Sequence, residues 1–233
     1  MTFPLPALFA LTLLTAALDW SAISRGWRRV EVITRPAVMG LLFLWVTFST
    51  DLQGAMLYFG VGIIFSLLGD VLLMREGQGT FLAGLAAFLL AQIAYVIGFN
   101  LTAPGTDLFG ILTAILVAIL MARLYRKIAA GLVASGQGRL RLPVLAYTFA
   151  LALMLLSALL TLFRRDWLPV PSLMAALGAA LFVTSDALLA RDRFIAPPQG
   201  GPAVTKGRLR IIILYHLGQI LLIAGVTLNY LGS

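Results

Sequence analysis

Residues 55–74 read AMLYFGVGIIFSLLGDVLLM, twenty residues in which Asp70 is the single charged side chain. A helix that crosses the hydrocarbon core of a bilayer needs about 20 consecutive apolar residues. The stretch therefore predicts a membrane-spanning helix. Its aspartate requires an explanation, because an ionisable group within a bilayer segment costs about 2.5–3.5 kcal/mol on insertion scales.

The same apolar pattern recurs along the whole chain. Of its 233 residues, 61% are hydrophobic and only 11% are charged, whereas soluble domains carry about 25% charged residues. Charges, prolines and glycine-rich turns divide the chain into eight apolar segments, at about 3–18, 36–50, 55–74, 80–99, 108–125, 142–162, 171–190 and 210–231. We expect an all-α integral membrane protein, a bundle of about eight transmembrane helices forming one domain over 1–233.

Two of these segments begin at prolines, Pro36 and Pro171. Proline is accepted in the first turn of a helix, where its missing N–H costs no hydrogen bond. The segment from Pro36 is short for a span, so we expect its helix to be tilted or irregular.

The basic residues predict the orientation of the bundle. The chain carries 17 basic and 9 acidic residues, a net charge of +8. With eight spans, fifteen of the basic residues fall on one side and only Arg164 and Arg165 on the other. Cytoplasmic loops carry the excess of lysine and arginine, so both termini are expected outside. We expect a multi-pass protein of the cell membrane (in a bacterium, the inner membrane) that binds no nucleic acid.

Two acidic residues lie well inside the predicted spans, Asp70 and Asp186. Each precedes an arginine, Arg75 or Arg191, by five residues. At a rise of 1.5 Å per residue, both carboxylates lie about 7–8 Å inside the cytoplasmic boundary. The two aspartates therefore share a depth, and they are the best candidates for catalysis.

Further polar side chains are expected near this layer. Tyr215 follows Arg210 by five residues, and Gln219 lies one turn farther on nearly the same helical face. Gln92 and Tyr95 fall on one stripe of the segment at 80–99 and lie deeper. Together they predict a polar pocket that opens to the cytoplasm, with Gln92 and Tyr95 at its floor. The alternative is that these groups, and either aspartate, serve as structural hydrogen-bonding partners between helices.

The combination of these residues resembles the YhhN-type lysoplasmalogenase family, small eight-helix membrane hydrolases that cleave the vinyl-ether bond of lysoplasmalogens. The matching residues appear in family order and span nearly the whole chain. They are Arg35-Pro36, Ser66 to Asp70, Phe81, Gly84-Leu85, Phe88, Tyr95, Gly178-Ala179, Phe182, Ser185-Asp186, Tyr215 and Gln219. The chain departs from the family at Gln92, where histidine is usual, and at Arg35, where lysine is usual.

The resemblance implies a hydrolase that releases an aldehyde and a glycerophospho head group from a lysophospholipid-like amphiphile. Asp70 and Asp186 would be its catalytic pair. The expected substrate-binding residues are Arg35, Gln92, Tyr95, Ser185, Tyr215 and Gln219. We expect no cofactor and no metal, since two aspartates alone make a poor metal site. The absence of cysteine also excludes thiolate ligands, disulfides and a cysteine nucleophile.

Two other functions use intramembrane aspartates. Intramembrane aspartyl proteases pair a Tyr-Asp with a Gly-x-Gly-Asp and a later Pro-Ala-Leu. Here leucine stands at 67 and serine at 185, and no Pro-Ala-Leu follows, so the sequence disfavours an intramembrane aspartyl protease. A proton-coupled transporter or lipid-binding protein would use the aspartates as a relay, and helices broken at mid-membrane would favour it.

Overall fold

The computed structural model describes residues 5–102, 107–196 and 201–232, with the side chains of 201 and 202 left out. Within these ranges eight helices are long and apolar enough to cross a membrane, and no strand is present, as the sequence predicts. They are α1 Leu5–Arg25, α2 Arg28–Thr50, α3 Ala55–Leu73, α4 Gln78–Phe99, α5 Leu108–Ala134, α6 Arg141–Leu160, α7 Pro169–Phe194 and α8 Gly201–Gly232. Short 3₁₀ turns, Gly138–Leu140 and Thr161–Phe163, extend both ends of α6.

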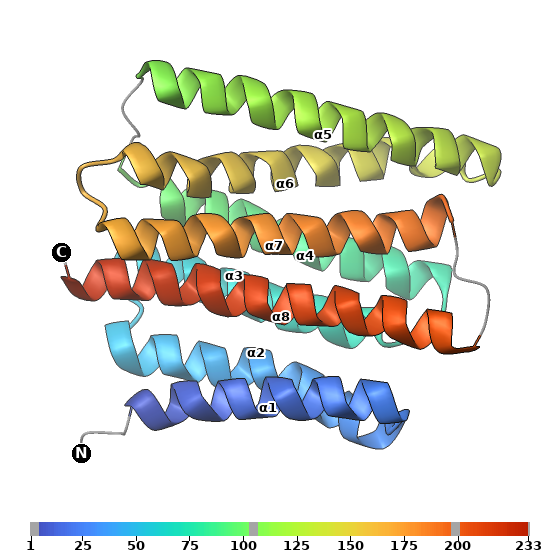
Figure 1. Ribbon diagram of the computed structural model, residues 1–233, viewed down its shortest axis with the longest axis horizontal. Coiled ribbons are helices and arrows are strands. Elements are labelled where there is room, and N and C mark those ends of the chain that lie inside the picture. Colours follow the sequence, from blue (N-terminus) through green and yellow to red (C-terminus); the bar gives the residue numbers. More distant parts are fainter. Residues whose placement is uncertain (1–4, 103–106, 197–200, 233) are drawn as a thin grey trace.

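The helices run side by side along the long axis of the molecule (Figure 1). Helix α1 pairs with α2 at one flank, α3 with α4, and α7 with α8, while α5 lies at the opposite flank against α6. Helix α1 begins and α8 ends at the same end of the bundle. The predicted fold class is thus confirmed, and the orientation of the bundle relative to the cytoplasm stays a prediction.

Close packing of α7 on α8 is made possible by three glycines. A Cβ atom added at Gly178 would lie 2.3 Å from the Leu222 nitrogen, and one added at Gly225 would lie 2.6 Å from the Pro171 carbonyl oxygen. Gly218 makes a similar approach from α8 toward α7. Small residues at helix interfaces let backbones approach closely in membrane proteins. This contact fixes the relative positions of the two helices that carry Asp186 and Tyr215.

The predicted start of the second helix is wrong. Helix α2 begins at Arg28, and Pro36 lies inside it rather than in its first turn. Helices α1 and α8 likewise extend beyond their apolar segments. Apolar runs end at charges, whereas these helices continue through them: Asp19, Glu31 and Arg35 are buried together, and other charged residues at the helix ends, such as Arg25 and Arg210, are exposed. Pro171, in contrast, does lie in the first turn of α7.

We predict that Gly178→Ala destabilises the protein, because its methyl group would overlap the α8 backbone. Overpacking of this kind costs about 1–3 kcal/mol. The measurement is the thermal unfolding midpoint in detergent, which should fall. Gly79→Ala is the matched control, because nothing lies within 4 Å of a Cβ atom at that helical position. Equal midpoints for the two variants would contradict the α7–α8 packing.

Candidate active site

A cavity of about 400 Å³ lies among α2, α3, α4, α7 and α8. Both predicted catalytic residues, Asp70 and Asp186, line it, although they belong to α3 and α7. The other polar and aromatic lining residues are Arg35, Phe88, Ser185, Asp192, Arg193, Arg208 and Tyr215. The sequence places the two aspartates at one depth, and the structure brings them to one cavity.

Asp70 is almost completely buried and is held by the α8 tyrosine. Its Oδ2 accepts a hydrogen bond of 2.8 Å from the Tyr215 hydroxyl. The Tyr215 ring packs edge-on against Phe88 and Phe182, at centroid distances of 5.7 and 5.8 Å. A Cβ atom at Gly69 would lie 2.6 Å from the Phe88 ring, so glycine before the aspartate makes room for this packing. Asp70 is therefore held by Tyr215, whose ring is in turn held between Phe88 and Phe182.

Asp186 has a different partner, Tyr147 of α6, whose hydroxyl donates a hydrogen bond to its Oδ2. The aspartate is half-buried and Tyr147 is buried. Tyr147 was not predicted from the sequence. It follows Arg141 by six residues, nearly the spacing that separates Tyr215 from Arg210, and applying the same depth criterion to α6 would have found it. Asp70 and Asp186 thus each accept a hydrogen bond from one buried tyrosine of a neighbouring helix.

Two other predicted site residues, Tyr95 and Gln219, serve packing rather than the cavity wall. Tyr95 donates a 2.8 Å hydrogen bond to Gln219 Oε1, and Gln219 Nε2 donates a 2.9 Å bond to Ser66 Oγ. These side chains are fully buried and are not among the cavity-lining residues. Ser185 lines the cavity, but its hydroxyl donates to the Ile211 carbonyl at 2.9 Å. The hydrogen bonds that link Tyr95, Gln219 and Ser66 join α3, α4 and α8 about one helical turn from Asp70 and Tyr215.

Gln92 occupies an unusual environment. It is fully buried, and neither its amide nitrogen nor its amide oxygen has a hydrogen-bond partner among the described residues. Tyr147 is among the polar side chains near it. An unsatisfied buried amide is costly, and a bound water or a ligand commonly supplies the missing partner. Gln92 does not line the cavity of the two aspartates, so the predicted floor is not formed there.

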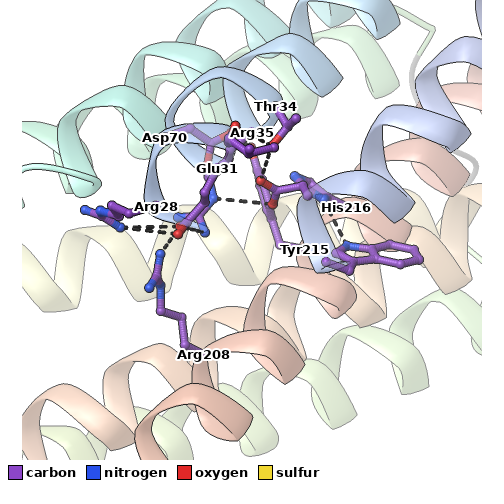
Figure 2. A network of polar contacts seen from close by, with 11 residues as sticks. Arg28, Glu31, Thr34, Arg35, Asp70, Arg208, Tyr215 and His216 are labelled. Carbon is purple, nitrogen blue, oxygen red and sulfur yellow. Dashed lines mark hydrogen bonds and ion pairs between the residues drawn. The ribbon is translucent and has the colours of Figure 1, made fainter. Parts of the chain in front are cut away.

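A buried cluster of charges lies next to the cavity (Figure 2). Glu31 pairs with Arg35 at 2.5 Å, with Arg28 at 3.4 Å and with Arg208 of α8. Asp19 of α1 accepts a 2.7 Å hydrogen bond from Thr34 and lies 3.8 Å from Arg35 Nε. The cluster connects α1, α2 and α8.

Further hydrogen bonds extend from this cluster. Arg28 donates to the Met74 carbonyl oxygen at 2.8 Å, which adds the end of α3. His216, next to Tyr215 on α8, accepts a 3.1 Å hydrogen bond at Nδ1 from the Trp20 indole. Figure 2 shows Tyr215 and His216 beside the charged side chains of α2. The N-terminal helix pair is therefore tied to the cavity by polar contacts.

The expectation that only two acids lie inside the bundle is wrong. Asp19 is fully buried and Glu31 is 2% exposed. The apolar segments excluded both, because such segments are defined by the absence of charge. Arg35 lies inside α2, is 6% exposed and already has two carboxylate partners. The charge of Arg35 is therefore shared with Asp19 and Glu31, and any anion that entered the cavity would compete with them for it.

The fold and the cavity define a multi-pass membrane protein with a pair of carboxylates in a pocket within its helix bundle. The sequence profile of the YhhN family matches residues 30–226, and the chain belongs to this family. It is 29% identical to "Lysoplasmalogenase TMEM86A" of Bos taurus over 164 residues and 29% identical to that of Homo sapiens over 163 residues.

These alignments cover 70% and 69% of this chain, and the chain spans about three fifths of the length of these relatives, 62% and 61%. No solved structure matches the chain.

We predict that Arg35→Met severely destabilises the protein, because it leaves Asp19 and Glu31 buried with less positive charge. Removing one partner from a buried ion pair costs about 3–5 kcal/mol. Thermal unfolding in detergent measures the effect. Adding Asp19→Asn and Glu31→Gln to this variant should restore most of the stability, because no buried carboxylate remains in the cluster.

Arg123→Met is the control for this experiment, since Arg123 is exposed on α5. A surface substitution of this kind changes stability by about 0.5 kcal/mol or less. If Arg35→Met is as stable as this control, the buried cluster does not hold α1 and α2 to the rest of the bundle.

Proposed function

We propose that this protein hydrolyses the vinyl-ether bond of a lysoplasmalogen, releasing an aldehyde and a glycerophospho head group, with Asp70 and Asp186 as the acid–base pair. The observation that carries the proposal is that both aspartates line one cavity. The family relatives named lysoplasmalogenase support the reaction class. Paired carboxylates in different environments suit acid-catalysed cleavage of a C–O bond through an oxocarbenium ion.

The reaction requires a proton donor, a water molecule and no redox partner. A neutral carboxylic acid protonates the vinyl carbon that is not bonded to oxygen, and the double-bond electrons form that C–H bond. The resulting oxocarbenium ion is attacked by water, whose proton passes to the ionised partner carboxylate. The hemiacetal then collapses: its hydroxyl proton passes to the first carboxyl, which is now ionised, the bond between the former vinyl carbon and the glycerol oxygen breaks, and the glycerol oxygen takes the proton held by the partner carboxyl. The aldehyde leaves, and both carboxyls return to their starting protonation states. One water is consumed in each turnover.

The surroundings of the aspartates suggest how the two roles divide. Arg35 and Asp70 line the same cavity, and the guanidinium attracts a carboxylate there. We assign the ionised role to Asp70, which also accepts from Tyr215. We assign the acid to Asp186. Neither aspartate has an ion pair among the described residues, and each has a tyrosine partner; the two differ in that the Arg35 charge acts on Asp70. Two carboxylates in unequal settings can divide acid and base roles in this way.

The mouth of the cavity suits a phosphate-bearing head group. Arg193 is exposed and Arg208 is partly exposed, and both line the cavity. Guanidinium groups bind phosphate through paired N–H donors. The head group would thus lie at the end of the bundle where α7 ends, which the distribution of basic residues predicts to be cytoplasmic.

We predict that Asp70→Asn and Asp186→Asn each reduce turnover of a lysoplasmalogen by at least about 100-fold, since general acid–base catalysis contributes roughly 10²–10⁴-fold. Asparagine keeps the size of the side chain but can neither donate the carboxylic proton nor carry the negative charge. The measurement is aldehyde release by purified protein in detergent, with the unfolding midpoint of each variant as a check of folding.

Asp51→Asn is the matched control. Asp51 is exposed at the end of α2 in the left-handed conformation (φ 49°), which asparagine also accepts. Its turnover should equal that of the wild type. Full activity in a folded Asp70→Asn or Asp186→Asn variant would exclude that residue from the mechanism, and no aldehyde from folded wild-type protein would overturn the proposed reaction.

A further inference from the structure

A second, apolar cleft lies on the other side of Asp186. It is narrow, about 50 Å³, and is formed by side chains of α4, α5, α6 and α7, including Phe81, Leu85, Leu124, Val144, Leu151 and Ala190. Asp186 and Leu189 line both this cleft and the larger polar cavity. The carboxylate assigned as the acid therefore lies where a polar space and an apolar space meet.

We propose that this cleft binds the hydrocarbon chain of the substrate next to the vinyl ether, while the head group occupies the polar cavity. The inference rests on the proposed function and adds a chain-binding subsite to it. A single-chain ether lipid has a polar and an apolar part joined at the vinyl ether. Placing each part in the space that matches it puts the double bond at Asp186.

Apart from Asp186 itself, the polar groups that line the cleft have no free O–H to donate to a polar ligand. The Thr148 hydroxyl donates to the Val144 carbonyl oxygen at 2.8 Å, and the Tyr147 hydroxyl donates to Asp186. The remaining lining side chains are aliphatic or aromatic. Burying a polar ligand there would leave its groups unpaired, which is costly, whereas burying methylene groups is favourable by about 0.8 kcal/mol each.

The cleft is also next to the helix that faces the lipid most. Helix α5 forms a flank of the bundle (Figure 1) and exposes a row of large apolar side chains, including Leu112, Leu116 and Ile119. The C-terminal half of α5 contacts the bundle through Ile128 and Leu132, which belong to one hydrophobic cluster with Val144 and Phe194. The hydrocarbon chain of the lipid can thus lie partly in the cleft beside α5 and continue into the bilayer.

The length of the cleft along α6 matches a short part of a hydrocarbon chain. Val144 and Leu151 are seven residues apart on α6, about 10 Å along the helix axis. Only the methylene groups nearest the vinyl ether would be enclosed, and the rest of a long chain would remain in lipid. Recognition of the chain would then depend on the cleft close to Asp186, where Ala187 and Ala190 supply small side chains.

Ala190→Phe tests the subsite by filling it. We predict a fall of about tenfold or more in kcat/KM for a long-chain lysoplasmalogen, a range within which hydrophobic pockets discriminate size. A vinyl ether with the same head group and a very short chain should lose much less. Ala118→Phe is the matched control, because Ala118 is exposed on α5 and outside the cleft. Equal losses for both chain lengths in folded Ala190→Phe would overturn the inference.

A binding measurement separates this inference from the proposed reaction. The probe is a saturated alkyl-ether lysophospholipid, which has no vinyl ether to hydrolyse, with a photoreactive diazirine near the glycerol end of its chain. Irradiation followed by peptide mass spectrometry should place adducts on cleft residues of α4, α6 or α7, and fewer in Ala190→Phe than in Ala118→Phe.

The outcomes of the two experiments are distinct. Adducts in the cleft without any aldehyde release from lysoplasmalogen would keep the chain subsite and reject the proposed reaction. Aldehyde release with adducts outside the cleft would keep the reaction and reject the subsite.

Discussion

The pairing of Arg35 with Asp19 and Glu31 inside the bundle is the constraint on which the active-site region depends. Each of these groups would be expelled from an apolar interior if it were alone, and together they allow α1 and α2 to pack against α8. Charged groups within membrane bundles are tolerated where they face the interior and pair with one another. The same arginine also contributes to the wall of the cavity that holds Asp70. Arg35 thus contributes both to the packing of the helices around the site and to the charge of the cavity wall.

Two spaces of opposite character meet at Asp186, and this arrangement organises the proposed chemistry. The polar cavity contains the aspartates and the arginines, and the cleft beside α5 contains aliphatic and aromatic side chains. Tyr147 holds Asp186 at this junction, and Tyr215 holds Asp70 across the cavity. An amphiphile whose scissile bond separates a polar from an apolar part is the substrate class that such a division suits. The helices that line the site are continuous, so the broken helices that would favour a transporter are absent from the described residues.

The sequence predicted the fold class, the number of helices and the two central aspartates, because apolar length and isolated intramembrane charge are local signals. It failed where charge is buried in pairs. The start of α2 was placed at Pro36, and Asp19 and Glu31 were overlooked, because the segments were defined by the absence of charge; the partners of Glu31 at Arg28 and Arg35 lie on the same helix. Tyr147 was missed because the depth criterion was not applied to α6. Gln92 is buried in the bundle, but its position outside the aspartate cavity depends on helix packing that no single sequence reveals.

The most direct test of the central claim is the fate of the transferred proton. Lysoplasmalogen is incubated with the protein in D₂O, and the released aldehyde is trapped at once and analysed by mass spectrometry. Protonation of the vinyl carbon by a carboxylic acid that exchanges with solvent predicts one deuterium on the carbon next to the aldehyde carbonyl. An aldehyde released by the protein without that deuterium would contradict acid-catalysed hydration and the role assigned to the aspartate pair.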